Sequence, residues 1–211
     1  MTRRSFLLTL ATLALGVPAT FAGPVYRVTL NTTPFSGTSG FVDLAFNQAN
    51  LVTSGPATAS ISNFISTGFT FTGGDQTSGA GVTGTFGAPP IVIANDVNAA
   101  NYYSIEVTFG TGISFDVMLA GGALTGGYSD PSAFLVTLYD NTFGYLTAPL
   151  ANSEVANIVI AGNGGITTQG STFNTTGSAD VTELPEPATL LMSGVALGLA
   201  GLLRMRLTAR V

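Results

Sequence analysis

The carboxylates are the main side chains in this sequence that could do chemistry. The 211 residues hold eleven Asp and Glu, whereas His and Cys are absent. Without His or Cys the chain has no Ser-His-Asp triad, no thiol nucleophile, no disulfide and no zinc or haem site of the usual kinds. All six basic residues are arginines, so Schiff-base chemistry and a P-loop lysine are excluded as well.

Two carboxylates, Glu106 and Asp116, lie in predicted strands, and a carboxylate pair is the usual machinery of glycoside hydrolysis. Such a pair has to face each other at roughly 5–9.5 Å. The alternation of each strand instead places both side chains on its solvent side, which is the default position of an acidic residue in a strand. The sequence therefore predicts no catalytic residue, and we expect a protein that is not an enzyme.

Four aspartates in predicted loops are the candidates for binding a metal ion: Asp75, Asp96, Asp130 and Asp140. Each lies beside Gly, Asn, Ser or Pro, and hard oxygen ligands of this kind suit calcium. The chain has neither EF-hand spacing nor a glycine–aspartate repeat, so the signal comes from composition alone. Our primary interpretation is that the carboxylates keep a lysine-free surface soluble and that no cofactor is bound. Calcium binding is the alternative.

The acidic residues concentrate in the middle of the chain. Between Gly23 and Pro187 a single arginine, Arg27, faces all eleven carboxylates, which gives this part a net charge of −10. Because such a domain repels phosphate backbones, we exclude nucleic acid as a partner. Polysaccharide remains a candidate partner, since tyrosine rings can stack on sugars. The tyrosines considered are Tyr102, Tyr103, Tyr128 and Tyr139, although the tryptophan that sugar platforms favour is absent.

Short runs of alternating apolar and polar residues must position these side chains. In the clearest run, from Ile113 to Leu119, every second residue is Ile, Phe, Val or Leu. Comparable runs predict strands over 25–30, 42–46, 57–64, 69–72, 81–86, 91–94, 105–109, 134–139, 155–161 and 179–182. Glycine-rich turns separate them. The pattern predicts an all-β antiparallel β-sandwich of jelly-roll or Ig-like topology, with a closed barrel as the alternative.

The N-terminal segment predicts export. Two arginines in the first four residues precede an apolar run over 6–17, and a small-x-small cleavage pattern follows and ends at Ala22. This is the order of a signal peptide, and the run is shorter than the ~20 residues that span a membrane. We predict cleavage between Ala22 and Gly23, with Ala19 as the second choice. The arginine pair leaves both Sec and Tat export open.

The C-terminal segment has a different order: Pro185-Glu186-Pro187, then the uncharged run Ala188–Leu203, then three arginines. Prolines are not tolerated inside a helix, so we expect a membrane-spanning helix to begin near Ala188. Arginines confined to its far side predict a cytoplasmic C-terminus and an exported N-terminal domain. These arginines are Arg204, Arg206 and Arg210.

In this order the segment from Leu184 to Arg210 resembles the PEP-CTERM sorting signal of Gram-negative envelope proteins. The resemblance implies recognition by an exosortase, a membrane protease-transpeptidase, in a bacterium that makes exopolysaccharide. By position, Pro185, Glu186 and Pro187 would form the recognised motif, and the arginine tail would retain the precursor in the inner membrane. Leu184 stands where valine is frequent in the family, and two apolar residues interrupt the tail. A tail anchor that is never cut is the alternative.

The sequence thus divides into a signal peptide (1–22), a β-sandwich ectodomain (23–183) and a sorting signal (184–211). The stretches 39–46 and 134–140 resemble ectodomains of PEP-CTERM proteins without assigned activity, which supports the fold class alone. We expect an exported, non-enzymatic protein of the cell envelope or exopolysaccharide matrix. Its precursor would be anchored in the inner membrane, and the mature form would lie at the cell surface or in the matrix. The alternative function is a secreted carbohydrate-binding module, with or without calcium.

Overall fold

The computed structural model describes residues 23–95, 100–146, 153–174 and 176–185. The predicted signal peptide with Ala22, the candidate calcium ligand Asp96 and the segment from Glu186 to Val211 lie outside the described residues. The predicted membrane helix and Arg204, Arg206 and Arg210 belong to that last segment. Within the described ranges, no helix is long and apolar enough to cross a bilayer. Residues Gly23–Leu184 group into one compact unit.

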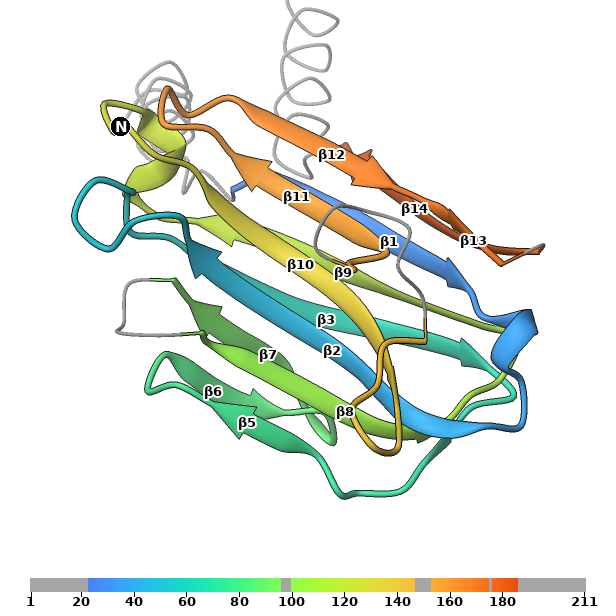
Figure 1. Cartoon of the computed structure of the whole chain (residues 1–211). Coiled ribbons are helices and arrows are strands. Elements are labelled where there is room, and N and C mark those ends of the chain that lie inside the picture. The colour runs from blue at the N-terminus through green and yellow to red at the C-terminus, as the bar shows by residue number, and fades with distance from the viewer. Residues whose placement is uncertain (1–22, 96–99, 147–152, 175, 186–211) are drawn as a thin grey trace, which may run out of the picture. The chain divides into compact units, whose positions relative to one another are not determined.

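Two antiparallel sheets pack face to face in this unit, as Figure 1 shows. Sheet A has the spatial order β13 (Thr172–Phe173), β14 (Gly177–Leu184), β1 (Val25–Asn31), β9 (Gly112–Ala120), β3 (Thr58–Thr67), β7 (Ala88–Ala94) and β6 (Val82–Thr85). Sheet B has the order β12 (Ile166–Gly170), β11 (Ala156–Ile160), β10 (Ser132–Asp140), β2 (Ser39–Gln48), β8 (Tyr102–Thr108) and β4 (Thr70–Phe71). The short strand β5 (Gln76–Ser78) also pairs with β8. The all-β sandwich predicted from the alternation is confirmed.

The core lies between the sheets and uses one face of each strand. On β9, the residues Ile113, Phe115, Val117 and Leu119 are all buried, because successive side chains of a strand point to opposite faces. Strands β2, β8, β10 and β11 of sheet B contribute their own buried Val, Leu, Ile and Phe side chains to the same cluster. The predicted runs therefore correspond to real strands. Strands β5, β12 and β13 were not predicted, because they are short, polar and lack alternation.

The connection between β8 and β9 crosses from sheet B to sheet A. The sequence predicts only a turn between two strong strands at this point. Gly110 lies in this connection so close to the end of β3 that a Cβ atom would come 2.1 Å from the Thr67 carbonyl oxygen. The hydroxyl of Thr32 donates to the Gly110 carbonyl at 2.9 Å, and the Thr111 amide donates to the Thr67 carbonyl at 2.9 Å. A glycine is required here because the backbones approach too closely for any side chain.

The first and last strands of the unit lie side by side in sheet A. Strand β1 pairs with β14 over its whole length, and Val25 is opposite Leu184. The chain enters β1 through Gly23, where a Cβ atom would come 1.7 Å from the Leu119 carbonyl oxygen. The Leu119 amide in turn donates to the Pro24 carbonyl at 3.0 Å. Both ends of the folded unit are therefore held by pairing in sheet A.

Candidate functional site

Four aromatic residues meet on the outer face of sheet B, and we call this group the aromatic face: Phe41, Tyr139, Phe143 and Tyr145. On β2, Phe41 precedes the inward-pointing Val42 and so points outward, and the register places it opposite Tyr139 of β10. Phe143 and Tyr145 lie in the loop after β10, which passes over this end of sheet B (Figure 1). The aromatic face thus combines two strands and one loop.

The carboxylate of Asp140 stabilises the loop after β10 by hydrogen bonds. Its Oδ1 accepts hydrogen bonds from the backbone amides of Thr142 and Gly144, both at 2.8 Å. These contacts, led by the Thr142 hydroxyl, lower the pKa of Asp140. The chain then turns back along β10, where the Leu146 amide donates to the Leu138 carbonyl at 3.0 Å. As a result Tyr145 forms a bridge with Tyr139.

The four rings contact one another in sequence. Phe143 stacks on Phe41 with ring centroids 4.4 Å apart and an interplanar angle of 15°. Tyr139 lies 6.0 Å from Phe143 and 5.0 Å from Tyr145. Phe41 is only 5% exposed although it lies outside the core cluster, whereas Phe143 and Tyr145 remain 44% and 57% exposed. The loop therefore covers one aromatic ring and presents two others to solvent.

Asp43 lies in the next row of the same face. The register places it between Thr137 of β10 and Ser104 of β8, and the Ser104 hydroxyl donates to its carboxylate. Asp43 is only 8% exposed, and this burial raises its pKa from 3.8 to about 6. Burial, the hydroxyl of Tyr145 and the charge of Asp43 raise the pKa of Tyr139. The aromatic face thus borders a carboxylate that has no basic partner among the described residues.

The four tyrosines considered for sugar stacking have separate places in the fold. Tyr139 belongs to the aromatic face, and Tyr102 of β8 points outward on the same side of sheet B. The prediction that Tyr103 could stack on a sugar is wrong, since its side chain is buried in the core. Its hydroxyl donates to Asp75 at 2.6 Å and accepts from the Phe86 amide at 2.9 Å, and burial raises its pKa to about 12. Tyr128, partly exposed, packs beside Gly55 and Gly122, away from this face.

Phe143 and Tyr145 were not predicted as site residues, because they lie in no alternating run. The signal that could have found them is the turn Asp140-Asn141-Thr142. Aspartate side chains commonly accept hydrogen bonds from backbone amides two residues onward, and such a turn reverses the chain. A reversal at this point brings the next residues back beside Tyr139.

The carboxylates Glu106 and Asp116 do not face each other. Glu106 lies on the outer face of sheet B, and Asp116 lies on the outer face of sheet A. The two outer faces of a sandwich point in opposite directions. These two residues therefore lack the paired geometry that glycoside hydrolysis needs. This agrees with the alternation in each strand, which predicts that both side chains point outward.

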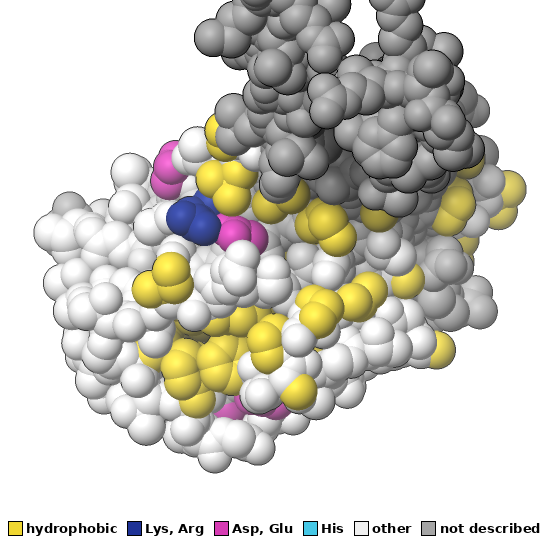
Figure 2. All heavy atoms as spheres, turned by 180° about the vertical axis from the view of Figure 1, so that it is seen from behind, with side chains coloured by type: hydrophobic (Ala, Val, Ile, Leu, Met, Phe, Trp, Pro, Cys, Tyr) yellow, Lys and Arg dark blue, Asp and Glu magenta, His cyan; other side chains and the backbone are white. Residues whose placement is uncertain are grey.

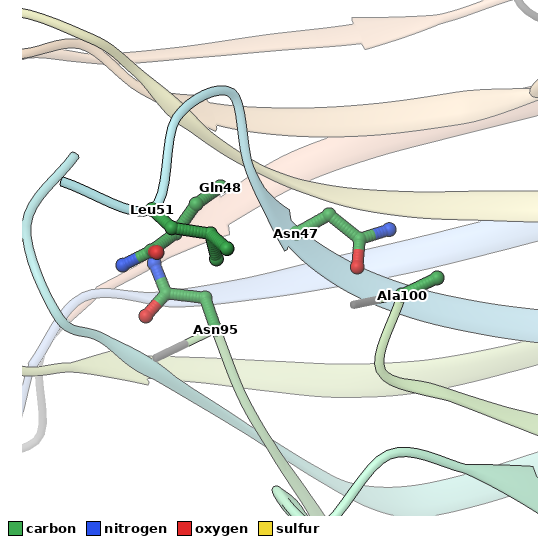
Figure 3. A pocket seen from close by; sticks show the side chains of 5 residues that line it. All are labelled: Asn47, Gln48, Leu51, Asn95 and Ala100. Carbon is green, nitrogen blue, oxygen red and sulfur yellow. The ribbon is translucent and has the colours of Figure 1, made fainter. Parts of the chain in front are cut away.

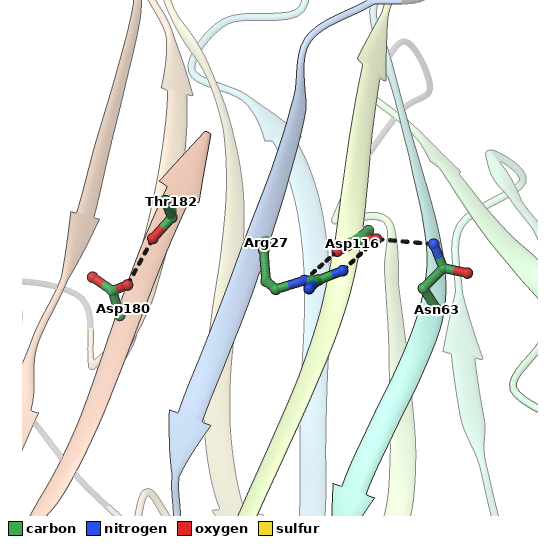
Figure 4. Close-up of polar contacts among 5 residues, drawn as sticks. All are labelled: Arg27, Asn63, Asp116, Asp180 and Thr182. Carbon is green, nitrogen blue, oxygen red and sulfur yellow. Dashed lines mark hydrogen bonds and ion pairs between the residues drawn. The ribbon is translucent and has the colours of Figure 1, made fainter. Parts of the chain in front are cut away.

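Asp116 is buried in spite of its outward position, because polar neighbours cover it. Arg27 of β1 donates from Nε to Oδ1 at 2.8 Å and from a terminal nitrogen to Oδ2 at 3.1 Å (Figure 4). Asn63 donates to Oδ2 at 2.9 Å. Asn63 has φ 54° in a bulge of β3, and the bulge turns its side chain toward Asp116. These donors, first of all Arg27, lower the pKa of Asp116.

The outer face of sheet A carries polar and hydrophobic side chains around this ion pair. Figure 2 shows it from behind: white polar side chains and backbone surround a basic side chain beside an acidic one, and hydrophobic side chains gather in a patch below them. On β14, the hydroxyl of Thr182 donates to Asp180 at 2.8 Å (Figure 4).

The aspartates considered for calcium are dispersed as far as the structure describes them. Asp75 accepts from Tyr103 and from the Glu106 amide, the latter at 3.1 Å. Asp130 and Asp140 lie at opposite ends of β10, and Asp130 accepts from the Thr53 hydroxyl. Within the described ranges no three acidic residues gather as a metal site would require.

A pocket of about 230 Å³ lies at the end of β2 (Figure 3). Its lining is Asn47, Gln48, Leu51, Asn95 and Ala100. The Asn95 side chain is already used by the fold, since it accepts from the Ala57 amide at 2.6 Å and donates to Gly55 and Ser132. The Asn95 amide in this pocket therefore serves mainly to join neighbouring loops.

Comparisons with protein-family models, with curated proteins and with solved structures found no match to this chain.

Proposed function

We propose that this chain is an exported, non-enzymatic protein of the cell envelope or extracellular matrix, sorted by an exosortase through its C-terminal signal. One observation carries the proposal. The last strand, β14, ends at Leu184, and the proposed recognition motif begins with the next residue, Pro185. Within the described residues, the β-sandwich therefore ends before the motif.

The pairing of β1 with β14 supports processing at both ends of the unit. Val25 and Leu184 are register partners, so the proposed cleavage sites flank the same end of one ladder. Cleavage before Gly23, and cleavage at or beyond Pro185, would leave every strand of the described residues intact. A protein whose two ends are cut has to keep its fold afterwards, and this arrangement meets that need.

The chemistry of the motif suits recognition by a protease. Proline restricts its own φ angle and keeps the residue before it extended, so we expect Pro185-Glu186-Pro187 to be a stiff, extended peptide. A protease can bind such a peptide without first unwinding a helix. The apolar run after Pro187 would keep the peptide near the membrane, and the arginines beyond it would resist translocation.

Two properties of the ectodomain favour a role without catalysis. The chain has no His, Cys or Lys. Glu106 and Asp116, the carboxylates considered for hydrolysis, lie on opposite outer faces, and Asp116 is held by Arg27 and Asn63. These contacts with Arg27 and Asn63 give Asp116 a structural role. The proposed role of the mature domain is therefore association with other envelope or matrix material.

Mass spectrometry of the protein's C-terminus, in a host that contains an exosortase, tests the proposal. We expect mature molecules that lack the apolar tail, and a variant with Pro185, Glu186 and Pro187 all changed to alanine that stays full-length in the inner membrane. The variant Glu183→Ala, which removes an exposed carboxylate just before the motif, is the matched control and should be processed normally. Intact Val211 on most wild-type molecules would contradict the proposal and show a permanent anchor.

A further inference from the structure

The aromatic face presents two exposed rings in a preformed position. Phe143 has φ 61°, a left-handed backbone conformation that is rare for a bulky residue. The Asp140 hydrogen bonds hold the loop in which this residue lies, and Phe41 supports its ring from below. Strained backbone of this kind persists only where the surrounding structure holds it, and it is concentrated at binding sites. Such a platform loses little conformational entropy when a ligand binds.

The surroundings of the rings are polar. Tyr145 and Tyr139 carry hydroxyl groups on their own rings, and the next row of outward positions in sheet B holds Thr137, Asp43 and Ser104, all largely buried. A ligand that fits here needs flat apolar surface for the rings and polar groups that can hydrogen-bond with the tyrosine hydroxyls. Sugar rings have both, because their C–H faces stack on aromatic rings while their hydroxyls donate and accept hydrogen bonds.

The charge of the face selects among sugars. Glu106 of β8 is the register partner of Phe41, and Asp43 lies in the next row of the same face. Arg27, the one basic residue in the described ranges, belongs to the opposite sheet. An acidic polysaccharide would meet carboxylates and no counter-charge, and would be repelled. A neutral polysaccharide carries no such penalty.

We propose that the aromatic face binds a neutral polysaccharide, with Phe143 and Tyr145 stacking on its sugar rings. This inference goes beyond sorting, since C-terminal processing requires no ligand. It is also tested separately, because binding is measured on the purified protein in the absence of an exosortase.

Native affinity electrophoresis of the full-length protein, solubilised in a detergent without sugar groups, provides the test. The gels contain hydroxyethylcellulose, xyloglucan, galactomannan or dextran as neutral probes, alginate as the acidic probe, or no polysaccharide. We expect retardation by at least one neutral probe and none by alginate. Phe143→Ala and Tyr145→Ala should each weaken binding about tenfold or more, the effect of losing one well-stacked ring. Tyr145→Phe should retain most of the binding.

The matched control is Ile65→Ala on β3, because Ile65 is 61% exposed but belongs to sheet A. It should leave binding unchanged, and circular dichroism should show that every variant keeps the β fold. Three results would overturn the proposal: no retardation by any neutral probe, retardation by alginate alone, or a loss of binding in Ile65→Ala as large as that in Phe143→Ala and Tyr145→Ala. Concentration-dependent dimerisation that Tyr145→Ala abolishes, without any retardation, would overturn it as well and assign the face to a second copy of this chain.

Discussion

Arg27 on β1 and Asp116 on β9, 89 residues apart in the sequence, bind each other through two nitrogen–oxygen contacts of 2.8 and 3.1 Å. The residues are direct register partners, so the ladder between the two strands aligns them. A two-contact pairing of guanidinium and carboxylate is the strongest geometry for such an ion pair. It explains how a carboxylate can be buried on the outer face of a sheet.

Replacing Arg27 by Met should lower the melting temperature by several degrees, because Asp116 would keep its charge in a buried position without its main partner. The double variant Arg27→Met/Asp116→Asn should recover part of the loss. Because the folded-state pKa of Asp116 is lowered, the stabilisation should be present at neutral pH and disappear as the pH falls through that pKa. Thermal melts by circular dichroism measure both effects, with exposed Asp180→Asn as the control; a double variant less stable than the single one would contradict this prediction.

Asp43 should make stability depend on pH in the opposite direction. Its folded-state pKa is raised from 3.8 to about 6, so the folded protein binds the proton more tightly than the unfolded chain. The stabilisation is complete below the unfolded pKa and is lost as the pH rises through about 6. Relative to wild type, the free energy of unfolding of Asp43→Asn should therefore rise by about 2 kcal/mol between pH 4 and pH 8. Urea unfolding at each pH measures this gain, and parallel pH curves for the two proteins would contradict it.

Removing a large core side chain should affect stability strongly. Phe46 is fully buried and packs edge-on against Phe134, with ring centroids 6.4 Å apart. Phe46→Ala should reduce the free energy of unfolding by about 3–5 kcal/mol, because it leaves a cavity between the sheets. Val52→Ala, at a side chain that is 88% exposed, should change it by less than about 0.5 kcal/mol. Urea titrations compare the two; similar values would mean that Phe46 does not belong to the core.

The chain without its C-terminal segment should keep the fold. A chain that ends after Pro185 retains all of β14, whereas a chain that ends after Thr176 loses this strand and leaves one side of β1 unpaired. We expect the first to match the melting temperature and the far-UV spectrum of the full chain, and the second to unfold or aggregate. Unfolding of the longer chain would show that the segment beyond Pro185 contributes to the folded unit.

Local pattern was enough to predict the main strands and their buried faces. From Ile113 to Leu119 the alternation predicts both, because neighbouring side chains of a strand always point to opposite sides. It also places Glu106 and Asp116 outward, as observed. The same rule was insufficient for Phe41 and Asp43, which point outward and yet are buried. Their burial depends on side chains and a loop that reach them from other parts of the chain.

The all-β class and the inward face of the main strands could be predicted from the sequence, and the sequence also excluded chemistry that requires His, Cys or Lys. Each of these follows from residue type or from spacing within one strand. The three-dimensional arrangement was needed to show that β8 and β9 belong to different sheets, that Arg27 binds Asp116, and that Phe143 covers Phe41. The physical reason is that strand pairing joins residues far apart in the chain, and the energy of a pairing depends on both partners, which no local pattern contains.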